Sequence, residues 1–367
     1  MKVLFDTRHY VLDREVGRLA DSVSVYILER VGLNDAGGIK QATSVAVEHV
    51  GSDFERRLVG WGIELTLPTF IRGYHRIVSE INPDVIVTAD FFRLSSWQAV
   101  FYKWRHPETR LIILSETKRW PTRKMSLMVM WILLALLRPF SYLIEKVIVY
   151  TDDGRRFFTE NWPGMSVVVV PPSVDTESFT PATDKIFMLG GVLRILMNAR
   201  FVDYKRHVVL LLALKQLKDQ GKSFTLTLIG RDDTGREAVR KQVLEFELKE
   251  QTCFLDPVPK ERLPVVYAGH DLLVLPSYNE ALGMVVPEAM ASGLPTLTSD
   301  TVGANVYVVP GATGLVFKTD DTDDLVRALG RCFDSEQLST FGTVAREYIV
   351  RHHAAATHSD RLIKELL

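Results

Sequence analysis

Short runs of apolar, mostly β-branched residues alternate with helix-length segments along almost the whole chain. Runs such as residues 167–170 and 195–197 are continuously apolar rather than alternating between apolar and polar. Continuous runs are typical of strands that are covered on both faces. A strand–helix–strand repeat of this kind predicts parallel sheets with right-handed crossovers, which is a doubly wound α/β fold.

The same pattern locates the expected elements. We expect strands in the first half at residues 2–5, 84–88, 110–114, 146–150 and 166–170. In the second half we expect them at residues 193–198, 224–229, 272–275, 295–298 and 315–317. Helices are expected between the strands at residues 208–219, 236–250 and 323–333, and again at 341–367, with a break at His352-His353.

The length of 367 residues is enough for two domains at about 150 residues each. Proline-rich, turn-forming sequence at Pro171-Pro172 and at residues 181–184 indicates an extended connection between them. We therefore predict two Rossmann-like domains, at residues 1–178 and 179–340, with the helix at 341–367 able to pack back on the first.

The composition excludes several classes of protein. With 47% hydrophobic and 24% charged residues the chain is not disordered. Its 44 basic and 45 acidic residues leave a formal charge of −1, so nucleic acid is not an expected partner. Cys253 and Cys332 lie far apart in no metal or redox spacing. Residues 1–6 read as a strand and not as a signal peptide, and together these features predict a cytoplasmic protein.

One apolar segment leaves two interpretations of where in the cell the protein acts. Residues 125–137 contain 13 uncharged residues, preceded by Lys118, Arg119, Arg123 and Lys124. The run is too short to cross a bilayer, which takes about 20 apolar residues. It is either a helix buried in the core or an interfacial helix whose basic residues meet anionic headgroups. The second interpretation predicts peripheral contact with the inner face of the cytoplasmic membrane through residues 119–138.

The segment 271–295 carries the clearest sign of chemistry. A strand at 272–275 leads to a loop with Glu280, Gly283 allows a turn, and Pro287 begins a helix that holds Glu288. Both carboxylates then lie at the carboxyl edge of a parallel sheet, where open α/β folds bind ligands. The backbone N–H groups suited to phosphate or sugar oxygens are those of Ala281, Leu282, Gly283 and Met284.

These residues resemble the retaining glycosyltransferases of the GT-B fold, family 4. The family pattern is Glu, seven residues, Glu, followed by Ala-Met-Ala-Ser-Gly-Leu-Pro, and residues 280–295 reproduce it. Residues 198–205 are similar to the family's strand end with the diphosphate-binding Arg and Lys. Residues 171–179 and 311–317 are similar to its interdomain signature and to the strand after the Glu loop. The likeness covers the C-terminal half well and the N-terminal half loosely.

The resemblance implies a role for each matching residue. Glu288 would bind the ribose of a nucleotide-sugar, and Glu280, with Ala281, would act on the donor sugar. Arg200 and Lys205 would neutralise the leaving diphosphate, together with the amides of Leu282, Gly283 and Met284, because a preorganised cationic pair stabilises that charge. The family needs no metal and no cofactor. Arg231 ends a strand at the same edge and either walls the base pocket or forms a plain turn. We expect the acidic pairs Asp232-Asp233 and Asp320-Asp321 to lie in solvated loops.

The N-terminal half departs from the family pattern. The family often has a glycine-rich loop after its first strand, whereas this chain has residues 6–10 (DTRHY), with Gly17 as the nearby glycine. Asp90 follows a strand where the family often carries His. It either contacts a substrate as a catalytic residue or caps the next helix. Glu116, after the strand at 110–114, is a second candidate on the acceptor side.

The resemblance therefore implies a retaining glycosyltransferase that moves a sugar from a nucleotide-diphosphate sugar to an acceptor. The domain at 179–340 would bind the donor, and the domain at 1–178 would bind the acceptor. The segment at 119–138 favours a lipid-linked or membrane-surface glycan, as in glycolipid or cell-envelope polysaccharide synthesis. The alternatives are a non-catalytic nucleotide-sugar-binding partner of another transferase and a nucleotide-sugar epimerase of the same fold.

Overall fold

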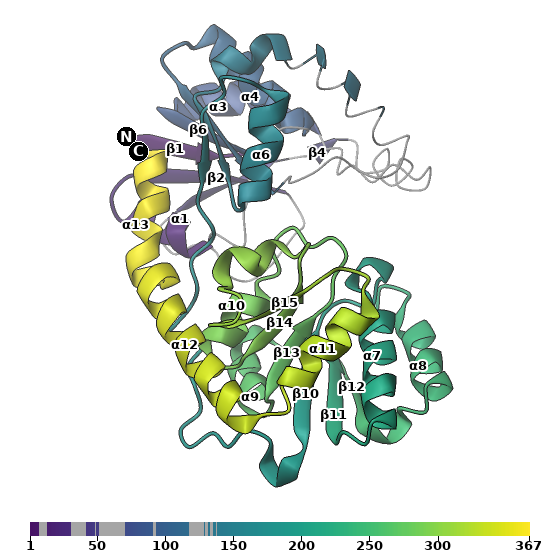
Figure 1. The fold of residues 1–367 in the computed structure, drawn as a ribbon. Helices are drawn as coiled ribbons and strands as arrows, with labels where there is room; N and C mark the ends of the chain where they lie inside the picture. The colour runs from purple at the N-terminus through teal and green to yellow at the C-terminus, as the bar shows by residue number, and fades with distance from the viewer. Residues whose placement is uncertain are drawn as a thin grey trace. The chain divides into compact units, whose positions relative to one another are not determined.

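The computed structural model describes residues 1–6, 13–30, 42–47, 49–50, 70–90, 93–116, 128, 131–132, 135–136 and 138–367. The chain divides into two compact units (Figure 1). Unit 1 comprises Met1–Ser173 and His358–Leu367, and unit 2 comprises Val174–Thr357. The division lies close to the predicted boundary at residue 178. The assignment of acceptor and donor to the two domains stays a prediction.

Unit 1 is built on a sheet with the strand order β3-β2-β1-β6-β7-β8-β9. Every neighbouring pair in this sheet is parallel. The strands are β1 (Lys2–Phe5), β2 (Ser24–Arg30), β3 (Thr43–Val47), β6 (Val85–Ala89), β7 (Arg110–Ser115), β8 (Lys146–Val149) and β9 (Val167–Val169). The five strands predicted in this half are confirmed. β2 and β3 were not predicted, although each contains a short apolar run, at residues 25–28 and 45–47.

The helices of unit 1 pack on this sheet and on one another. They are α1 (Asp13–Ala20), α3 (Tyr74–Ile81), α4 (Leu94–Arg105), the 3-10 helix η2 (Arg138–Leu143) and α6 (Asp152–Asn161). A short antiparallel pair joins β4 (His49–Val50) to β5 (Phe70–Ile71). The core between sheet and helices includes Leu4, Ile86, Leu111, Val147 and Phe158, each at most 1% exposed. Burial of such side chains contributes about 1.5–3 kcal/mol each and holds the layers together.

Unit 2 has a second parallel sheet, with the order β12-β11-β10-β13-β14-β15. The strands are β10 (Leu193–Asn198), β11 (Phe224–Ile229), β12 (Thr252–Leu255), β13 (Leu272–Leu275), β14 (Thr296–Ser299) and β15 (Gly314–Phe317). The five strands predicted in this half are confirmed. The chain builds outward from β10 through β11 to β12 and then returns to the other side of β10 with β13. Both sheets are therefore doubly wound, and the predicted Rossmann-like GT-B architecture is confirmed.

The helices of unit 2 cover both faces of its sheet (Figure 1). They are α7 (His207–Asp219), α8 (Arg236–Glu245), α9 (Leu263–Ala268), α10 (Val285–Ala291), α11 (Thr322–Arg331) and α12 (Ser335–His353). The expectation of one helix over 236–250 was wrong at its C-terminal end. Helix α8 ends at Glu245 because Glu247 has a left-handed φ of 57°, and a separate 3-10 turn, η5 (Lys249–Gln251), follows.

The last helix returns the chain to unit 1. Helix α12 ends at His353, and Ala354 forms a parallel bridge with Val174. Helix α13 (Ala355–Leu366) follows, so the predicted break near His352-His353 is confirmed. Within unit 1, Arg110 Nη1 donates to the Leu367 carbonyl at 2.5 Å, and Lys146 Nζ lies 3.1 Å from Glu365 Oε2.

The apolar segment at 125–137 is described at five positions. Met128, Trp131, Ile132 and Leu136 are helical and 53–55% exposed. Their spacing places them on one helix face, and a helix buried in the core is therefore excluded for these residues. The rest of the run and the basic residues at 118–124 lie outside the described residues. No helix in the described part of the chain is long and apolar enough to span a bilayer.

Candidate active site

The predicted donor residues gather where the strand order of unit 2 reverses. Arg200 and Lys205 follow β10, and Glu280 follows β13, which is its neighbour in the sheet. Arg231 follows β11, on the other side of β10. Since all these strands are parallel, the residues meet at the carboxyl edge of the sheet. Such a reversal leaves a crevice in which doubly wound sheets bind ligands.

Lys205 and Glu280 form an ion pair at the centre of this edge. Lys205 Nζ donates to Glu280 Oε2, and the two side chains are only 10% and 15% exposed. Ser277 Oγ lies 3.4 Å from the same carboxylate oxygen. The loop after β13 is tied to the turn that holds Lys205, because the Tyr278 N–H donates to the Tyr204 carbonyl at 2.7 Å. The pair therefore combines two residues that are far apart in sequence.

Two glycines shape the loop that follows Glu280. Gly283 has a φ of +84°, and a Cβ there would lie 3.0 Å from Glu280 Cγ. Gly303 donates its N–H to the Glu280 carbonyl at 2.9 Å, and a Cβ there would lie 1.9 Å from the Ala281 carbonyl oxygen. Both positions require glycine. Within the described residues, no hydrogen bond satisfies the N–H groups of Ala281, Leu282, Gly283 or Met284.

Glu288 lies in the first turn of α10 and is 7% exposed. The buried Tyr267 hydroxyl donates to Glu288 Oε2 at 3.4 Å, and Lys260 Nζ lies 3.8 Å from Oε1. Burial, followed by the charge of Glu288, raises the pKa of Tyr267 well above its usual value, so its hydroxyl stays a donor. This arrangement fixes a carboxylate that can accept hydrogen bonds from hydroxyl groups of a ligand.

Arg200 and Arg231 share one carboxylate, that of Asp233. Arg200 Nη1 lies 3.0 Å from Asp233 Oδ2, and Arg231 Nε lies 2.8 Å from Oδ1. Arg200 Nη2 also donates to the Tyr204 hydroxyl at 2.6 Å. Hydrogen bonding from Arg231, reinforced by Arg200, lowers the pKa of Asp233. The expectation of a solvated acidic loop is therefore wrong for Asp233, whose side chain is 26% exposed and paired twice.

The loop that holds Asp233 lies directly against the end of β10. A Cβ at Gly230 would lie 1.9 Å from the Ala199 carbonyl oxygen, and one at Gly235 would lie 2.4 Å from that of Phe201. Phe201 also forms a parallel bridge with Asp232. Both glycines are required by these close backbone contacts. The glycines at each end of the segment GRDDTG were the sequence signal that could have identified Asp233.

A second polar cluster lies in unit 1, where the strand order reverses between β1 and β6. Asp6, directly after β1, is fully buried and accepts hydrogen bonds from the Thr88 hydroxyl and, at 3.2 Å, from the Ala89 N–H. Burial raises the pKa of Asp6 from 3.8 to about 6, and these hydrogen bonds partly offset the effect. Sequence analysis did not identify Asp6 as a candidate.

Asp90 belongs to the same cluster. It has a φ of +63°, and its Oδ1 accepts a hydrogen bond from Ser115 Oγ at 2.7 Å. Ser96 Oγ donates to the Asp90 carbonyl at 2.6 Å. The interpretation of Asp90 as a helix cap is wrong, because the residue at the N-cap of α4 is Arg93.

The two remaining acceptor-side candidates, Glu116 and Gly17, lie on other elements of unit 1. Glu116 follows β7 and is exposed. Gly17 lies inside helix α1, so it does not provide the loop that the family comparison suggested. Residues 7–10, where the family often has its glycine-rich loop, lie outside the described residues.

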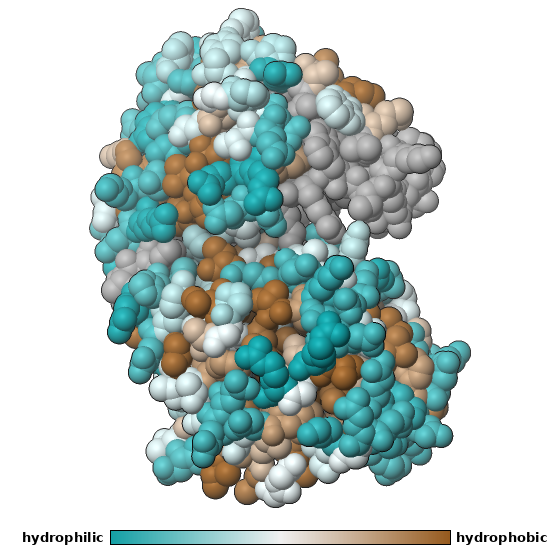
Figure 2. Space-filling model, viewed as in Figure 1, coloured by the Kyte–Doolittle hydropathy of each residue, from teal (hydrophilic) through white to brown (hydrophobic). Residues whose placement is uncertain are grey.

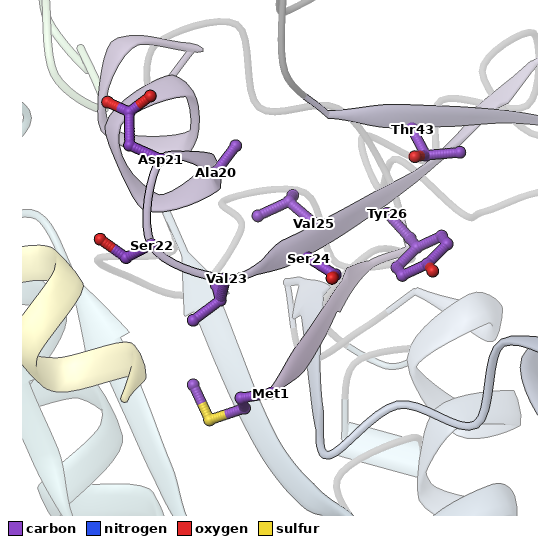
Figure 3. A pocket seen from close by; sticks show the side chains of 9 residues that line it. All are labelled: Met1, Ala20, Asp21, Ser22, Val23, Ser24, Val25, Tyr26 and Thr43. Carbon is purple, nitrogen blue, oxygen red and sulfur yellow. The ribbon is translucent and has the colours of Figure 1, made fainter.

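Unit 1 also contains a cavity of about 460 Å³ (Figure 3). Its lining includes Met1, Ser24 and Tyr26 at the start of β1 and along β2, with Thr43 at the start of β3. The cavity therefore lies at the amino-terminal edge of the sheet and contains none of the predicted site residues. Ligands of parallel α/β sheets bind at the opposite edge, and we place no site in this cavity.

Most of unit 2 matches a known protein family. Residues 187–347 match the family Glycosyl transferases group 1. Unit 2 belongs to this family. The match spans the group 1 domain from before β10 into α12 and includes Arg200, Lys205, Asp233, Glu280 and Glu288.

Curated relatives of the group 1 domain are glycosyltransferases. The chain is 32% identical over 186 residues to D-inositol 3-phosphate glycosyltransferase of Nocardia farcinica, covering 47% of the chain and 41% of the relative. It is 26% identical to a GDP-mannose-dependent phosphatidylinositol monomannoside mannosyltransferase of Mycolicibacterium smegmatis, covering 58% and 59%. The matches span about half the length of these relatives.

Solved structures share the fold over the whole chain. A sucrose-phosphate synthase from Thermosynechococcus elongatus superposes with a TM-score of 0.77 at 18% identity, covering 99% of this chain and 97% of that one. Anabaena HepE, solved with UDP and glucose, superposes with a TM-score of 0.73 at 17% identity, covering 100% and 99%. At these identities the likeness establishes the fold.

Proposed function

We propose that the protein is a glycosyltransferase that moves a sugar from a nucleotide-diphosphate sugar to an acceptor. The observation that carries the proposal is the Lys205–Glu280 pair with Arg200 at the strand reversal of a group 1 domain. Here a cation and a carboxylate lie side by side, as required for a leaving group that gains negative charge and a sugar that gains positive charge. Relatives named as glycosyltransferases support the same activity.

The reaction proceeds with retention of configuration in this proposal. The bond from the anomeric carbon to the diphosphate oxygen breaks, and the electron pair leaves with the diphosphate beside Lys205 and Arg200. The acceptor hydroxyl forms the new bond on the same face, and its proton passes to the leaving phosphate oxygen. Glu280 stabilises the positive charge on the sugar. Glu288 binds the ribose, and Arg231 lines the base pocket.

The proposed chemistry takes its positive charge from side chains and needs no metal ion. Arg200 and Lys205, with the four unpaired N–H groups of residues 281–284, supply donors and charge for the diphosphate. Activity is therefore expected to survive EDTA, and a loss of activity in EDTA would contradict this part of the proposal.

The acceptor is a lipid-linked or membrane-surface glycan in this proposal. The exposed apolar residues Met128, Trp131, Ile132 and Leu136 are followed by the exposed Phe140 and Tyr142 of η2, which contacts α4. On α4, Phe101 and Trp104 are exposed, and the Arg105 guanidinium lies 3.9 Å from the centre of the Phe101 ring. Figure 2 shows hydrophobic residues at the surface of this unit. Aromatic and aliphatic side chains next to an arginine suit the interface of an anionic bilayer.

A donor screen tests the transfer activity. The protein is mixed with UDP-, GDP- and ADP-sugars, with and without EDTA, and the released nucleoside diphosphate is measured. We expect release with one base, and its loss in Lys205→Ala but not in Lys215→Ala, a control that removes an exposed lysine from a surface pair with Asp219. The anomeric configuration of the product, read by NMR, tests retention. Absence of both release and nucleotide binding would overturn the proposal.

Flotation with vesicles tests the membrane contact. The protein should float with vesicles that contain anionic lipid and not with neutral vesicles. The double substitution Ile132→Ser and Leu136→Ser should abolish flotation. The matched control is Ile186→Ser with Leu189→Ser, which removes two aliphatic side chains of unit 2 that are 63% and 61% exposed. Equal flotation of both double variants would exclude this surface as the contact.

A further inference from the structure

Both cations that the proposed function assigns to the diphosphate are already neutralised by carboxylates in this structure. Lys205 is paired with Glu280, and Arg200 is paired with Asp233. The two pairs differ in their access to water. The side chains of the first are 10% and 15% exposed, whereas Arg200 is 47% exposed and Asp233 26%. A ligand arriving from solvent therefore meets the Arg200–Asp233 pair as the more accessible of the two.

Building on the proposed function, we propose that Asp233 is a counter-ion that the diphosphate displaces from Arg200. In this way Asp233 weakens the binding of the nucleoside diphosphate product more than that of the nucleotide-sugar donor. Asp233 is a specificity-determining residue that acts by its negative charge beside Arg200 and makes no contact of its own with the sugar.

The contacts of Asp233 keep the free-energy cost of this displacement low. When Asp233 Oδ2 releases Arg200, Oδ1 keeps its bond to Arg231 Nε at 2.8 Å. The carboxylate is therefore never left without a cationic partner, which is the costly condition for a partly buried charge. Arg200 remains held by the Tyr204 hydroxyl at 2.6 Å, so the guanidinium stays at the carboxyl edge of β10.

The exchange requires rotation of side chains and not movement of the loop. Gly230 and Gly235 allow the loop to lie against the carbonyls of Ala199 and Phe201. Asp232 Oδ1 accepts the Arg236 N–H at 3.1 Å and closes the same loop at the start of α8. The backbone of Asp233 is thus anchored on both sides, which keeps its carboxylate near Arg200 after displacement.

A carboxylate that stays near the diphosphate distinguishes the nucleoside diphosphate product from the nucleotide-sugar donor by their charge. The product has a terminal phosphate whose second ionisation, with a pKa of about 6, adds a negative charge that the donor does not carry. Repulsion between unit charges about 4 Å apart costs about 1 kcal/mol in water, which is roughly a fivefold change in affinity. Asp233 therefore penalises the product more than the donor and promotes its release.

The test is the affinity of the protein for nucleoside diphosphates and for the matching nucleotide-sugars, measured by calorimetry at pH 8. UDP, GDP and ADP are the probes. Asp233→Asn should bind the nucleoside diphosphate about fivefold more tightly than the unchanged protein, with a smaller gain for the nucleotide-sugar. Asp233→Glu keeps the charge and should restore the original ratio. Asp219→Asn removes a surface carboxylate paired with Lys215 and should change neither affinity.

The outcomes separate the two proposals. If the unchanged protein binds no nucleoside diphosphate and no nucleotide-sugar, the proposed function and this inference both fall. If it binds them and Asp233→Asn binds the nucleoside diphosphate equally or more weakly, the proposed function stands and the counter-ion role of Asp233 is overturned. Equal gains in affinity for the nucleoside diphosphate and for the nucleotide-sugar would show that Asp233 does not distinguish product from donor. Thermal unfolding of each variant checks that it is folded.

Discussion

The two units are built on the same plan but carry different chemistry at corresponding places. In each, the strand order reverses beside the first strand of the sheet, between β1 and β6 in unit 1 and between β10 and β13 in unit 2. The reversal in unit 1 contains Asp6 and Asp90, held by hydroxyl groups. The reversal in unit 2 contains carboxylates held by Lys205 and Arg200. A shared topology thus fixes where a site lies, and the residues at the strand ends decide which ligand charge it suits.

The largest expected effect concerns the carboxylate of Glu280 in unit 2. Glu280→Gln keeps the shape of the side chain but removes the negative charge proposed to stabilise the sugar. We expect the transfer rate to fall about 10²- to 10³-fold, as for loss of one preorganised electrostatic group. The rate of nucleoside diphosphate release with saturating donor and acceptor measures it. A rate within a fewfold of the unchanged protein would remove Glu280 from the mechanism.

The second prediction concerns the buried carboxyl of unit 1. The pKa of Asp6 is raised from 3.8 to about 6, so the folded state holds the proton more tightly than the unfolded state. The free energy of unfolding should therefore fall as the pH rises from about 4 through 6, by up to about 3 kcal/mol. Asp6→Asn does not titrate and should lack this component.

Urea unfolding of both proteins between pH 4 and 7.5 provides the measurement. We expect the stability of Asp6→Asn, relative to the unchanged protein, to increase with pH over this range. Two curves that run parallel would show that Asp6 does not titrate between folded and unfolded states in this way.

The third prediction tests the close backbone contact beneath the Asp233 loop. Gly230→Ala places a Cβ 1.9 Å from the Ala199 carbonyl oxygen, and we expect it to lower the free energy of unfolding by about 1–3 kcal/mol. Gly330→Ala in α11 is the matched control, since a Cβ there meets nothing within 4 Å. Alanine in a helix should leave stability equal or raise it by up to about 1 kcal/mol. Similar unfolding midpoints for the two variants would contradict the assigned contact.

The smallest expected effect compares one buried tyrosine from each unit. Tyr267→Phe removes the hydroxyl that donates to Glu288 and should cost about 1 kcal/mol of stability. The Tyr74 hydroxyl in unit 1 is buried and, within the described residues, has no hydrogen-bond partner. Tyr74→Phe should therefore be neutral or stabilising. Chemical unfolding of the pair measures the difference, and a larger loss for Tyr74→Phe would reverse the comparison.

The sequence was sufficient for the features that depend on local pattern. Continuous apolar runs predicted ten of the parallel strands, and Gly283 and Pro287 placed Glu280 in a loop and Glu288 in a first helical turn. Strands β2 and β3 were missed because their apolar runs, at residues 25–28 and 45–47, are only four and three residues long and are flanked by polar residues such as Ser24, Glu29 and Ser44. The extension of α8 to residue 250 was wrong because the left-handed backbone at Glu247 has no sequence signal of its own.

The polar networks were not predictable for a different reason. Asp6 is held by Thr88, and Asp90 by Ser115, and these partners come from different strands of the sheet. In sequence, each appears only as a carboxylate after an apolar run. Asp233 was likewise predicted to lie in a solvated loop, because its contacts with Arg200 and Arg231 arise only when the strand ends come together. Contacts of this kind depend on which strands become neighbours, and local patterns of residues do not show the strand order.

The return of α13 to unit 1 has a consequence for how the chain is assembled. Unit 2 is continuous in sequence, so every contact within it can form as soon as residue 357 has left the ribosome. Unit 1 is discontinuous, and its contacts to Arg110 and Lys146 wait for Glu365 and Leu367. The usual order of synthesis, in which the first domain is completed first, is therefore inverted in this protein. Joining residues 358–367 to the front of unit 1 by circular permutation would restore it.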